Sequence, residues 1–379
     1  MTDLSTKRTS TYIPGLDGIR AIAFGLVYVA HAGLDYLVPG GLGVTIFFFL
    51  SGYLITTLLR TEMERTGRIS ISQFYLRRTL RIFPPMYVTL IVWIGLTALG
   101  VLVGQLQWQP IVLASVYLTN YIGVLTPHRL EGGLGILWSL SVEEHFYLLF
   151  PWLLLLFLRK GRSFKTTAPF LSALCALALA WRLVLILYFH ATAATYTHTD
   201  TRFDSILFGC LLAVFLNPLL DQIPSWISNR SATLAVAGLV VLFGCLIFRR
   251  PVFRETFRYS IQGLALMPIF LFVLDAPRTW VVRLLERPVL RFLGRRSYAM
   301  YLIHLCILNA VHMKLGVNML WTAMISAPLV VGYAYAMWRL VEAPLGNLRK
   351  SRLPAPEHRD KRWHKSDAQE QGLKQVVSS

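Results

Sequence analysis

The feature that most constrains this chain is a series of apolar runs, each close to the length of a membrane-spanning helix. Such a helix needs about 20 mostly apolar residues. Ten runs fit: residues 19–37, 43–59, 86–103, 142–158, 170–189, 205–219, 232–248, 261–274, 298–311 and 320–341. A shorter run, 111–125, is broken by polar residues and predicts a re-entrant or interfacial helix. We expect an all-α polytopic membrane helical bundle of about 10 transmembrane helices, with 11 as the alternative count.

Composition excludes the other classes of protein. Of 379 residues, 55% are hydrophobic and 15% charged, whereas soluble proteins carry about 25% charged residues. Too few polar side chains exist to cover soluble domains, which excludes a water-soluble enzyme, a disordered protein and a fibrous protein. The net charge of +18 is concentrated between the apolar runs and in the last thirty residues, the positive-inside pattern. We therefore expect a lipid bilayer, and no nucleic acid, as partner.

The basic segments also predict orientation. The start of the chain, residues 60–81, 159–165 and 283–296, and the tail from 349 all predict a cytoplasmic location. Both termini are then cytoplasmic in the inner (plasma) membrane, although the basic segment 249–258 falls outside in this scheme. We expect a cytoplasmic N-terminal segment (1–11), one transmembrane domain (12–345) and a basic, disordered cytoplasmic tail (346–379). The first run is interpreted as an uncleaved anchor.

Arg20 and His31 lie on one face of the first predicted helix. Eleven helical residues turn through about 1,100°, so the two side chains point within about 20° of each other, roughly 16 Å apart along the axis. Arg20 would stand at the cytoplasmic mouth and His31 about halfway into the membrane. Ionisable groups at that depth are usually functional. A histidine hydrogen-bonded to a neighbouring helix is the alternative.

A basic segment precedes the third run. Residues 74–85 predict an amphipathic cytoplasmic helix that ends at Pro84 and Pro85, with the prolines starting the next span. Arg77, Arg78 and Arg81 would form one cationic patch. Anchoring to lipid headgroups is the favoured explanation; binding the phosphates of an anionic cofactor is the alternative.

Polar side chains also gather at the starts of later spans. Glu143 and Tyr147 are one turn apart and predict a shared cavity. Arg202 and Asp204 predict a structural charge pair at the membrane edge. The remaining polar positions are Ser297, Tyr301 and His304, a stripe on one helix; hydrogen bonding in the core is the alternative to a functional role and is slightly favoured for His304. The four cysteines show no paired spacing and predict small buried hydrophobic residues, with no metal site. The glycines at 40, 41, 43 and 52 predict close helix packing.

Several segments together resemble the acyltransferase 3 family of membrane proteins. The matching pieces are GLDGIRAIA with His31 eleven residues after Arg20, GGLGVTIFFFLSGYLI, FYLRRTLRIFPP, LWSLSVEEHFYLLFP, TRFDSILFGCLLA, RRSYAMYLIHLCIL and VEAPL. Each piece alone is a weak signal. Their order over about residues 10–345 makes the resemblance specific.

The resemblance implies an O-acyltransferase that moves an acyl group, commonly acetyl from acetyl-CoA, to a hydroxyl of a carbohydrate. The family's Arg-x10-His motif falls on Arg20 and His31, and its Arg-x-x-Arg motif on Arg78 and Arg81. The glutamate of its WSLxxE element is Glu143, and His145 stands where the family often has glutamine.

From the residues and the resemblance together, we hypothesise that His31 is the general base and that Glu143 orients it or binds the sugar. An acyl-histidine relay remains open. The donor would be held by Arg20, Arg77, Arg78 and Arg81. The acceptor would be bound by Ser141, Tyr147, Arg202, Asp204, Tyr301 and His304. Acyl-CoA is then a substrate, and no permanently bound cofactor is expected.

A membrane transporter or flippase is the alternative. In that class, intramembrane histidine, glutamate and arginine would bind or relay the cargo. It predicts inverted repeats and interrupted helices in both halves, and the sequence shows neither.

Overall fold

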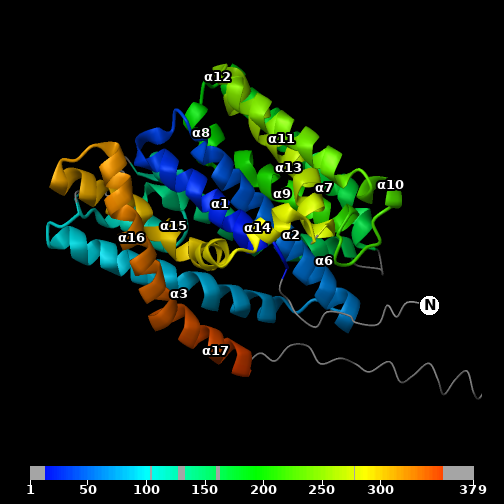
Figure 1. Ribbon diagram of the computed structural model, residues 1–379, viewed down its shortest axis with the longest axis horizontal. Coiled ribbons are helices and arrows are strands. Elements are labelled where there is room, and N and C mark those ends of the chain that lie inside the picture. Colours follow the sequence, from blue (N-terminus) through cyan, green and yellow to red (C-terminus); the bar gives the residue numbers. More distant parts are fainter. Residues whose placement is uncertain (1–12, 103–104, 127–132, 159–162, 277, 353–379) are drawn as a thin grey trace, which may run out of the picture.

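The structure, a computed structural model, describes residues 13–102, 105–126, 133–158, 163–276 and 278–352, with side chains up to residue 348. Within these ranges the chain is helical, with no strand (Figure 1). Each of the ten apolar runs coincides with a long helix: α1 (Leu16–Val29), α2 (Gly40–Thr66), α3 (Ile71–Ala98), α6 (Trp138–Leu158), α7 (Ala168–Leu187), α9 (Thr199–Phe215), α11 (Ser231–Ile247), α13 (Phe257–Asp275), α15 (Pro288–Leu315) and α16 (Met319–Met337). The all-α prediction is confirmed for the described residues.

Seven of these helices are long and apolar enough to cross a membrane: α2, α3, α6, α7, α13, α15 and α16, some extended by adjoining turns. The others are shorter, with 14 residues in α1 and 17 each in α9 and α11. At 1.5 Å per residue, 17 residues cover about 25 Å, less than the roughly 30 Å hydrocarbon core. The chain is therefore multi-pass, with seven candidate spans by length and composition.

Short elements connect the long helices. They are α4 (Trp108–Ser115), η2 (Thr119–Tyr121), α5 (Ile122–Leu125), η3 (Leu134–Leu137), η4 (Phe164–Thr167), α8 (Thr192–Thr197), α10 (Ser225–Ser228), α12 (Pro251–Glu255), α14 (Trp280–Leu285), η5 (Trp338–Glu342) and α17 (Ala343–Arg352). The run 111–125 is divided among α4, η2 and α5, with Tyr117 at a positive φ of 57° between them, so the single helix predicted there is wrong.

The basic helix predicted at residues 74–85 is not a separate element. It forms the first half of α3, which continues through Pro84 and Pro85 to Ala98. Prolines deprive the carbonyl groups one turn earlier of donors, but membrane helices tolerate them where neighbours supply hydrogen bonds. The carbonyl groups that lose an intrahelical donor are those of Leu80 and Arg81, and α15 contacts the helix directly beside them, where the hydroxyl of Tyr298 donates to the Ile82 carbonyl oxygen at 2.8 Å. The helix thus continues, packed against α15, where the sequence predicted a break.

Close packing of α2 against α9 forms the centre of the bundle. A Cβ added at Gly52 would overlap the Ile206 carbonyl, and one at Gly209 would overlap the Phe49 carbonyl. Gly43 likewise faces the Ala23 carbonyl of α1. Small residues allow membrane helices to approach in this way. The packing prediction is confirmed at Gly43 and Gly52.

The connections lie at two opposite ends of the bundle. In Figure 1, α8, α12 and the loop between α1 and α2 lie at the top, whereas α17 and the C-terminal end of α2 lie at the bottom. Between these ends, α1 packs against α2 on one side and α15 on the other. The side chains of these three helices therefore meet inside the bundle.

Candidate functional site

The predicted intramembrane histidine lies at a distortion of its helix. After Val29, α1 widens into a π turn, Ala30–Leu34, in which Gly33 has a φ of 90°. The His31 Nδ1 lies 2.9 Å from Nε2 of His304 in α15, and the two rings stack with centroids 5.1 Å apart. Such turns occur frequently at functional sites. Two histidines from separate helices thus form a pair.

The hydrogen bonds around this pair determine which nitrogen carries each proton. Nδ1 of His304 lies 2.7 Å from the Tyr301 carbonyl oxygen, which can only accept, so this nitrogen is protonated. His304 is 0% exposed, and a charged ring there, without a carboxylate, would be costly. The ring is therefore neutral, and its Nε2 accepts the Nδ1 proton of His31. This assignment, inferred from the network, leaves a lone pair on Nε2 of His31, whose side chain is exposed.

Aromatic and hydroxyl groups hold His304 in place. The rings of Phe24 and Tyr28 in α1 lie 5.6 and 6.3 Å from its ring. The Tyr301 hydroxyl is hydrogen-bonded to the Ser139 hydroxyl at 2.7 Å. Tyr301 and His304 are both buried and both hydrogen-bonded, and the roles in acceptor binding predicted for them stay predictions.

A second polar cluster surrounds Glu143. The Ser51 hydroxyl donates to its Oε1 at 2.7 Å, and the Tyr147 hydroxyl donates to its Oε2 at 3.3 Å. The Arg78 guanidinium lies 4.1 Å from the Tyr147 ring centroid, and both Arg20 and Arg78 interact electrostatically with Glu143. Four helices thus bring two arginines to Glu143. Glu143 and Tyr147 contact each other, as residues one turn apart can, and the cavity that they are predicted to share stays a prediction.

The structure gives the two predicted catalytic residues different partners. Among the described residues, Glu143 bonds to Ser51 and Tyr147, whereas His31 bonds to His304. The partner of the His31 imidazole is therefore a second histidine. The electrostatic influence of Glu143 does reach Tyr298 and Tyr301. Tyr298 and Tyr301 precede His304 on α15 by six and three positions, about 9 and 4.5 Å along the helix axis.

The three arginines of α3 do not form one patch. Arg77 pairs with Glu62 of α2 at 3.1 Å, and Arg78 stacks on Tyr147 of α6. Arg81 lies with Glu342, where both line a small pocket of about 130 Å³. Each side chain meets a different neighbour because successive positions on a helix are rotated by about 100°. Of the three, Arg78 is the one that joins Arg20 beside Glu143.

Arg202 and Asp204 do not form the charge pair that the sequence predicted between them. Asp204 binds Arg182 of α7 at 2.7 Å and accepts a hydrogen bond from Ser260 at 2.8 Å. Arg202 lies instead over the Tyr259 ring, 3.9 Å from its centroid. Arg182 was missed, although an arginine inside the apolar run 170–189 requires a buried partner.

The other predicted substrate residue, Ser141, is fully buried. Its hydroxyl is hydrogen-bonded to the Thr119 hydroxyl at 2.7 Å. Ser139, two residues earlier, is connected to the histidine pair instead: its hydroxyl bonds to the Tyr301 hydroxyl, and the Tyr301 carbonyl oxygen accepts from His304. All four cysteines are buried and free, as predicted for small buried hydrophobic residues.

Comparison with known proteins shows that the chain is similar to bacterial O-acetyltransferases. It is 29% identical to the peptidoglycan O-acetyltransferase OatA of Listeria monocytogenes over 363 residues, 90% of this chain and 57% of the relative. A putative O-acetyltransferase of Staphylococcus aureus is 32% identical over 349 residues, and the O-acetyltransferase OatA of that organism is 28% identical over 351, each covering 88% of this chain and 57% of the relative. The chain thus spans less than two thirds of the length of these relatives. No solved structure matches it.

The family assignment rests on most of the chain. Residues 13–339 match the acyltransferase 3 family, described as an acyltransferase domain. This range includes His31, His304, Arg20, Arg78 and Glu143. The resemblance inferred from the ordered sequence motifs is therefore confirmed, and the chain belongs to the acyltransferase 3 family of membrane acyltransferases.

Proposed function

We propose that this protein is an integral membrane O-acetyltransferase that moves an acetyl group from acetyl-CoA to a hydroxyl of a carbohydrate. The observation that carries the proposal is the histidine pair: the hydrogen bonds from His31 to His304 and on to the Tyr301 carbonyl leave an unprotonated Nε2 on the exposed ring of His31. An aligned, neutral imidazole is the group that most often removes a proton from an attacking hydroxyl.

The reaction follows from this assignment. Nε2 of His31 takes the proton of the acceptor hydroxyl as its oxygen attacks the thioester carbonyl carbon. When the tetrahedral intermediate collapses, the carbon–sulfur bond breaks and the protonated imidazole returns its proton to the leaving thiolate. Base catalysis of this kind supplies about 10²- to 10⁴-fold in rate. His304 holds His31 in the reactive tautomer throughout.

The cluster at Glu143 is proposed to receive the donor. Coenzyme A carries several negative charges, and the arginine fork suits phosphate. Arg20 and Arg78 lie together there, whereas Arg77 pairs with Glu62 and Arg81 lies with Glu342 on other sides of α3, so the proposed donor site uses Arg20 and Arg78. Arg20 precedes His31 by eleven residues, roughly 16 Å along the helix, so the thioester end of a donor held at Arg20 would extend towards His31. Glu143 positions the Tyr147 ring, on which Arg78 rests.

The proposed topology has ten spans with both termini cytoplasmic: the seven candidate spans together with α1, α9 and α11, whose shorter length would require local thinning of the bilayer. The Arg20 end then faces the cytosol, where acetyl-CoA is available, and the end with α8 and α12 faces outward. The acceptor is proposed to be a cell-envelope glycan, because the relative from Listeria is named for peptidoglycan. Tyr147 and Tyr301 are proposed to contact the acceptor. Ser141, Arg202 and Asp204 are proposed to hold the helices around the acceptor site in place through the buried contacts described above.

Transfer of labelled acetyl groups tests the proposal. Purified protein in nanodiscs is incubated with labelled acetyl-CoA and a cell-envelope glycan extract, and label in the glycan is counted. His31→Ala is expected to abolish transfer. The control, His190→Asn, removes a histidine from an exposed loop and should leave transfer unchanged. Equal transfer by His31→Ala and wild type would overturn the proposed base, and no consumption of acetyl-CoA by the wild type would overturn the donor.

A further inference from the structure

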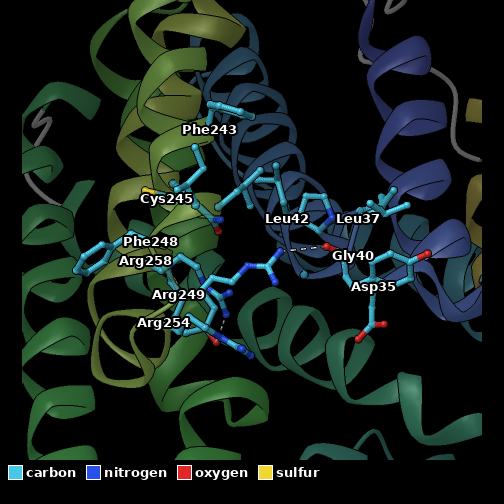
Figure 2. Close-up of a pocket in the computed structure, with 18 of the residues that line it drawn as sticks. Asp35, Leu37, Gly40, Leu42, Phe243, Cys245, Phe248, Arg249, Arg254 and Arg258 are labelled. Carbon is cyan, nitrogen blue, oxygen red and sulfur yellow. Dashed lines mark hydrogen bonds between the residues drawn. The ribbon is translucent and has the colours of Figure 1, made fainter.

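A pocket of about 730 Å³ lies between the α1–α2 loop and the connection from α11 to α13. Its size is typical of small-molecule sites. One wall consists of residues 35–42 and the other carries three arginines, Arg249, Arg254 and Arg258 (Figure 2). The pocket lies at the end of the bundle that holds α8 and α12 (Figure 1). It is thus separate from the cluster around Glu143.

The charge of this pocket is positive. Three arginines line it, against the single carboxylate of Asp35. Arg254 lies 3.6 Å from Glu255, whereas Arg249 donates to the Tyr36 carbonyl at 3.0 Å and Arg258 to the Tyr259 hydroxyl at 3.3 Å. Within the described part of the chain, Arg249 and Arg258 form no ion pair with a carboxylate, and Nε of Arg258 is buried without a hydrogen bond.

A fourth arginine lies beneath the pocket floor. Arg202 is 0% exposed, and its guanidinium lies 3.9 Å from the ring of Tyr259 and 5.6 Å from that of Tyr196, both of which line the pocket. Among the described residues, its Nη2 donates to the Thr45 hydroxyl at 3.3 Å. Nε and Nη1 of Arg202 have no hydrogen-bond partner among the described residues. A buried cation with free donors therefore supports the positive potential of the floor.

Membrane topology does not account for this concentration of charge. Basic loops are expected on the cytoplasmic side, yet residues 249–258 lie at the end of the bundle opposite α17 and the C-terminal end of α2 (Figure 1). An arginine cluster at that end therefore requires another explanation. Arginine forks are the preferred partners of carboxylate and phosphate groups, and Tyr196, which is partly exposed in the pocket, offers a ring for a sugar to contact.

We propose that this pocket binds an acidic group, a carboxylate or phosphate, on the carbohydrate acceptor. The proposal rests on the proposed function, since it names the chemical class of the acceptor. Two lining residues lie close to the proposed catalytic pair: Asp35 follows His31 by four residues, and Tyr196 packs on Trp138 at 5.0 Å, next to the Ser139 that bonds Tyr301. An acceptor held by its acidic group would thus present its hydroxyls towards His31.

Binding of two sugar probes tests this inference without the chemical reaction. Tetragalacturonate and a neutral tetraose of equal length are titrated into protein in phosphatidylcholine nanodiscs, with affinity measured by calorimetry. The wild type should bind the acidic probe at least about tenfold more tightly, because each charge-assisted hydrogen bond changes affinity by about that factor. Arg249→Gln and Arg258→Gln should remove this preference. Arg250→Gln, an exposed neighbour that does not line the pocket, should keep it.

The outcomes separate this inference from the proposed function. His31→Ala should bind the acidic probe as the wild type does, so the binding result stands even if transfer fails. Equal binding of the two probes, or an equal effect of Arg250→Gln and Arg258→Gln, would overturn the inference. Loss of acidic-probe binding when phosphatidylglycerol replaces part of the lipid would assign the pocket to a lipid headgroup and overturn it as well.

Discussion

Replacing His304 tests whether this buried histidine sets the protonation of His31. In the wild type, Nε2 of His304 accepts the Nδ1 proton of His31 at 2.9 Å. His304→Leu removes this acceptor and allows the His31 ring to place its proton on the reactive Nε2. His304→Gln keeps an acceptor oxygen near the position of Nε2, so the hydrogen bond can re-form.

The size of the effect follows from the lost hydrogen bond. A donor left without its acceptor costs about 1–3 kcal/mol. This range corresponds to a loss of about 5- to 160-fold in kcat for His304→Leu, less than the 10²- to 10⁴-fold that removing the base itself can cost. His304→Gln should retain most of the activity. Acetyl transfer at saturating acetyl-CoA is measured in nanodiscs for the wild type and for both variants.

The control for this series is another histidine of the same helix. His312 bonds to the Val317 carbonyl at 3.1 Å near the end of α15, so His312→Leu should leave kcat unchanged. The reasoning is refuted if His304→Leu keeps full activity at an unchanged melting temperature. It is also refuted if His304→Gln loses as much activity as His304→Leu, since the acceptor would then be irrelevant.

Three further predictions concern packing, pH and the donor. Gly52→Ala should lower stability by about 1–3 kcal/mol because the methyl group overlaps the Ile206 carbonyl, whereas Gly95→Ala, with open space around it, should not lower the melting temperature. Partial burial acts to raise the pKa of Asp221, but the hydrogen bonds and charge of Arg60 outweigh it and hold that pKa below its usual value. The stabilisation of the fold by ionised Asp221 is therefore complete above about pH 4 and is lost as the pH falls through the lowered pKa. The difference in melting temperature between wild type and Asp221→Asn should accordingly disappear in acid. A difference that persists at low pH would contradict the ion-pair explanation. Arg78→Lys should raise the KM for acetyl-CoA about tenfold or more, since it removes the fork beside Arg20. Arg77→Lys, held by Glu62, should change KM far less, and equal effects would refute the placement of the donor.

The sequence predicts the helices, but it does not predict which residues far apart in the chain contact each other in the fold. The helices of the apolar runs follow from hydropathy alone, and the spacing of Arg20 and His31 follows from helical geometry. The partner of His31 does not, because His304 is 273 residues away in the chain and only the packing of α1 on α15 brings them together. The continuity of α3 through two prolines depends likewise on a neighbouring helix. Arg182 could have been recognised, since a charge inside an apolar run implies a buried counter-charge, but its partner Asp204 required the fold.

The first helix ends in the π turn at His31. Gly33, inside the turn, has a φ of 90°, a left-handed conformation that a regular helix does not contain. Two sites are linked by this ending, since His31 lies within the turn and the wall of the arginine-lined pocket begins directly after it. Any residue larger than glycine at position 33 would be strained and would meet Met319, so it would disturb the histidine and the loop together. The backbone at one glycine therefore sets the direction of the loop relative to the histidine.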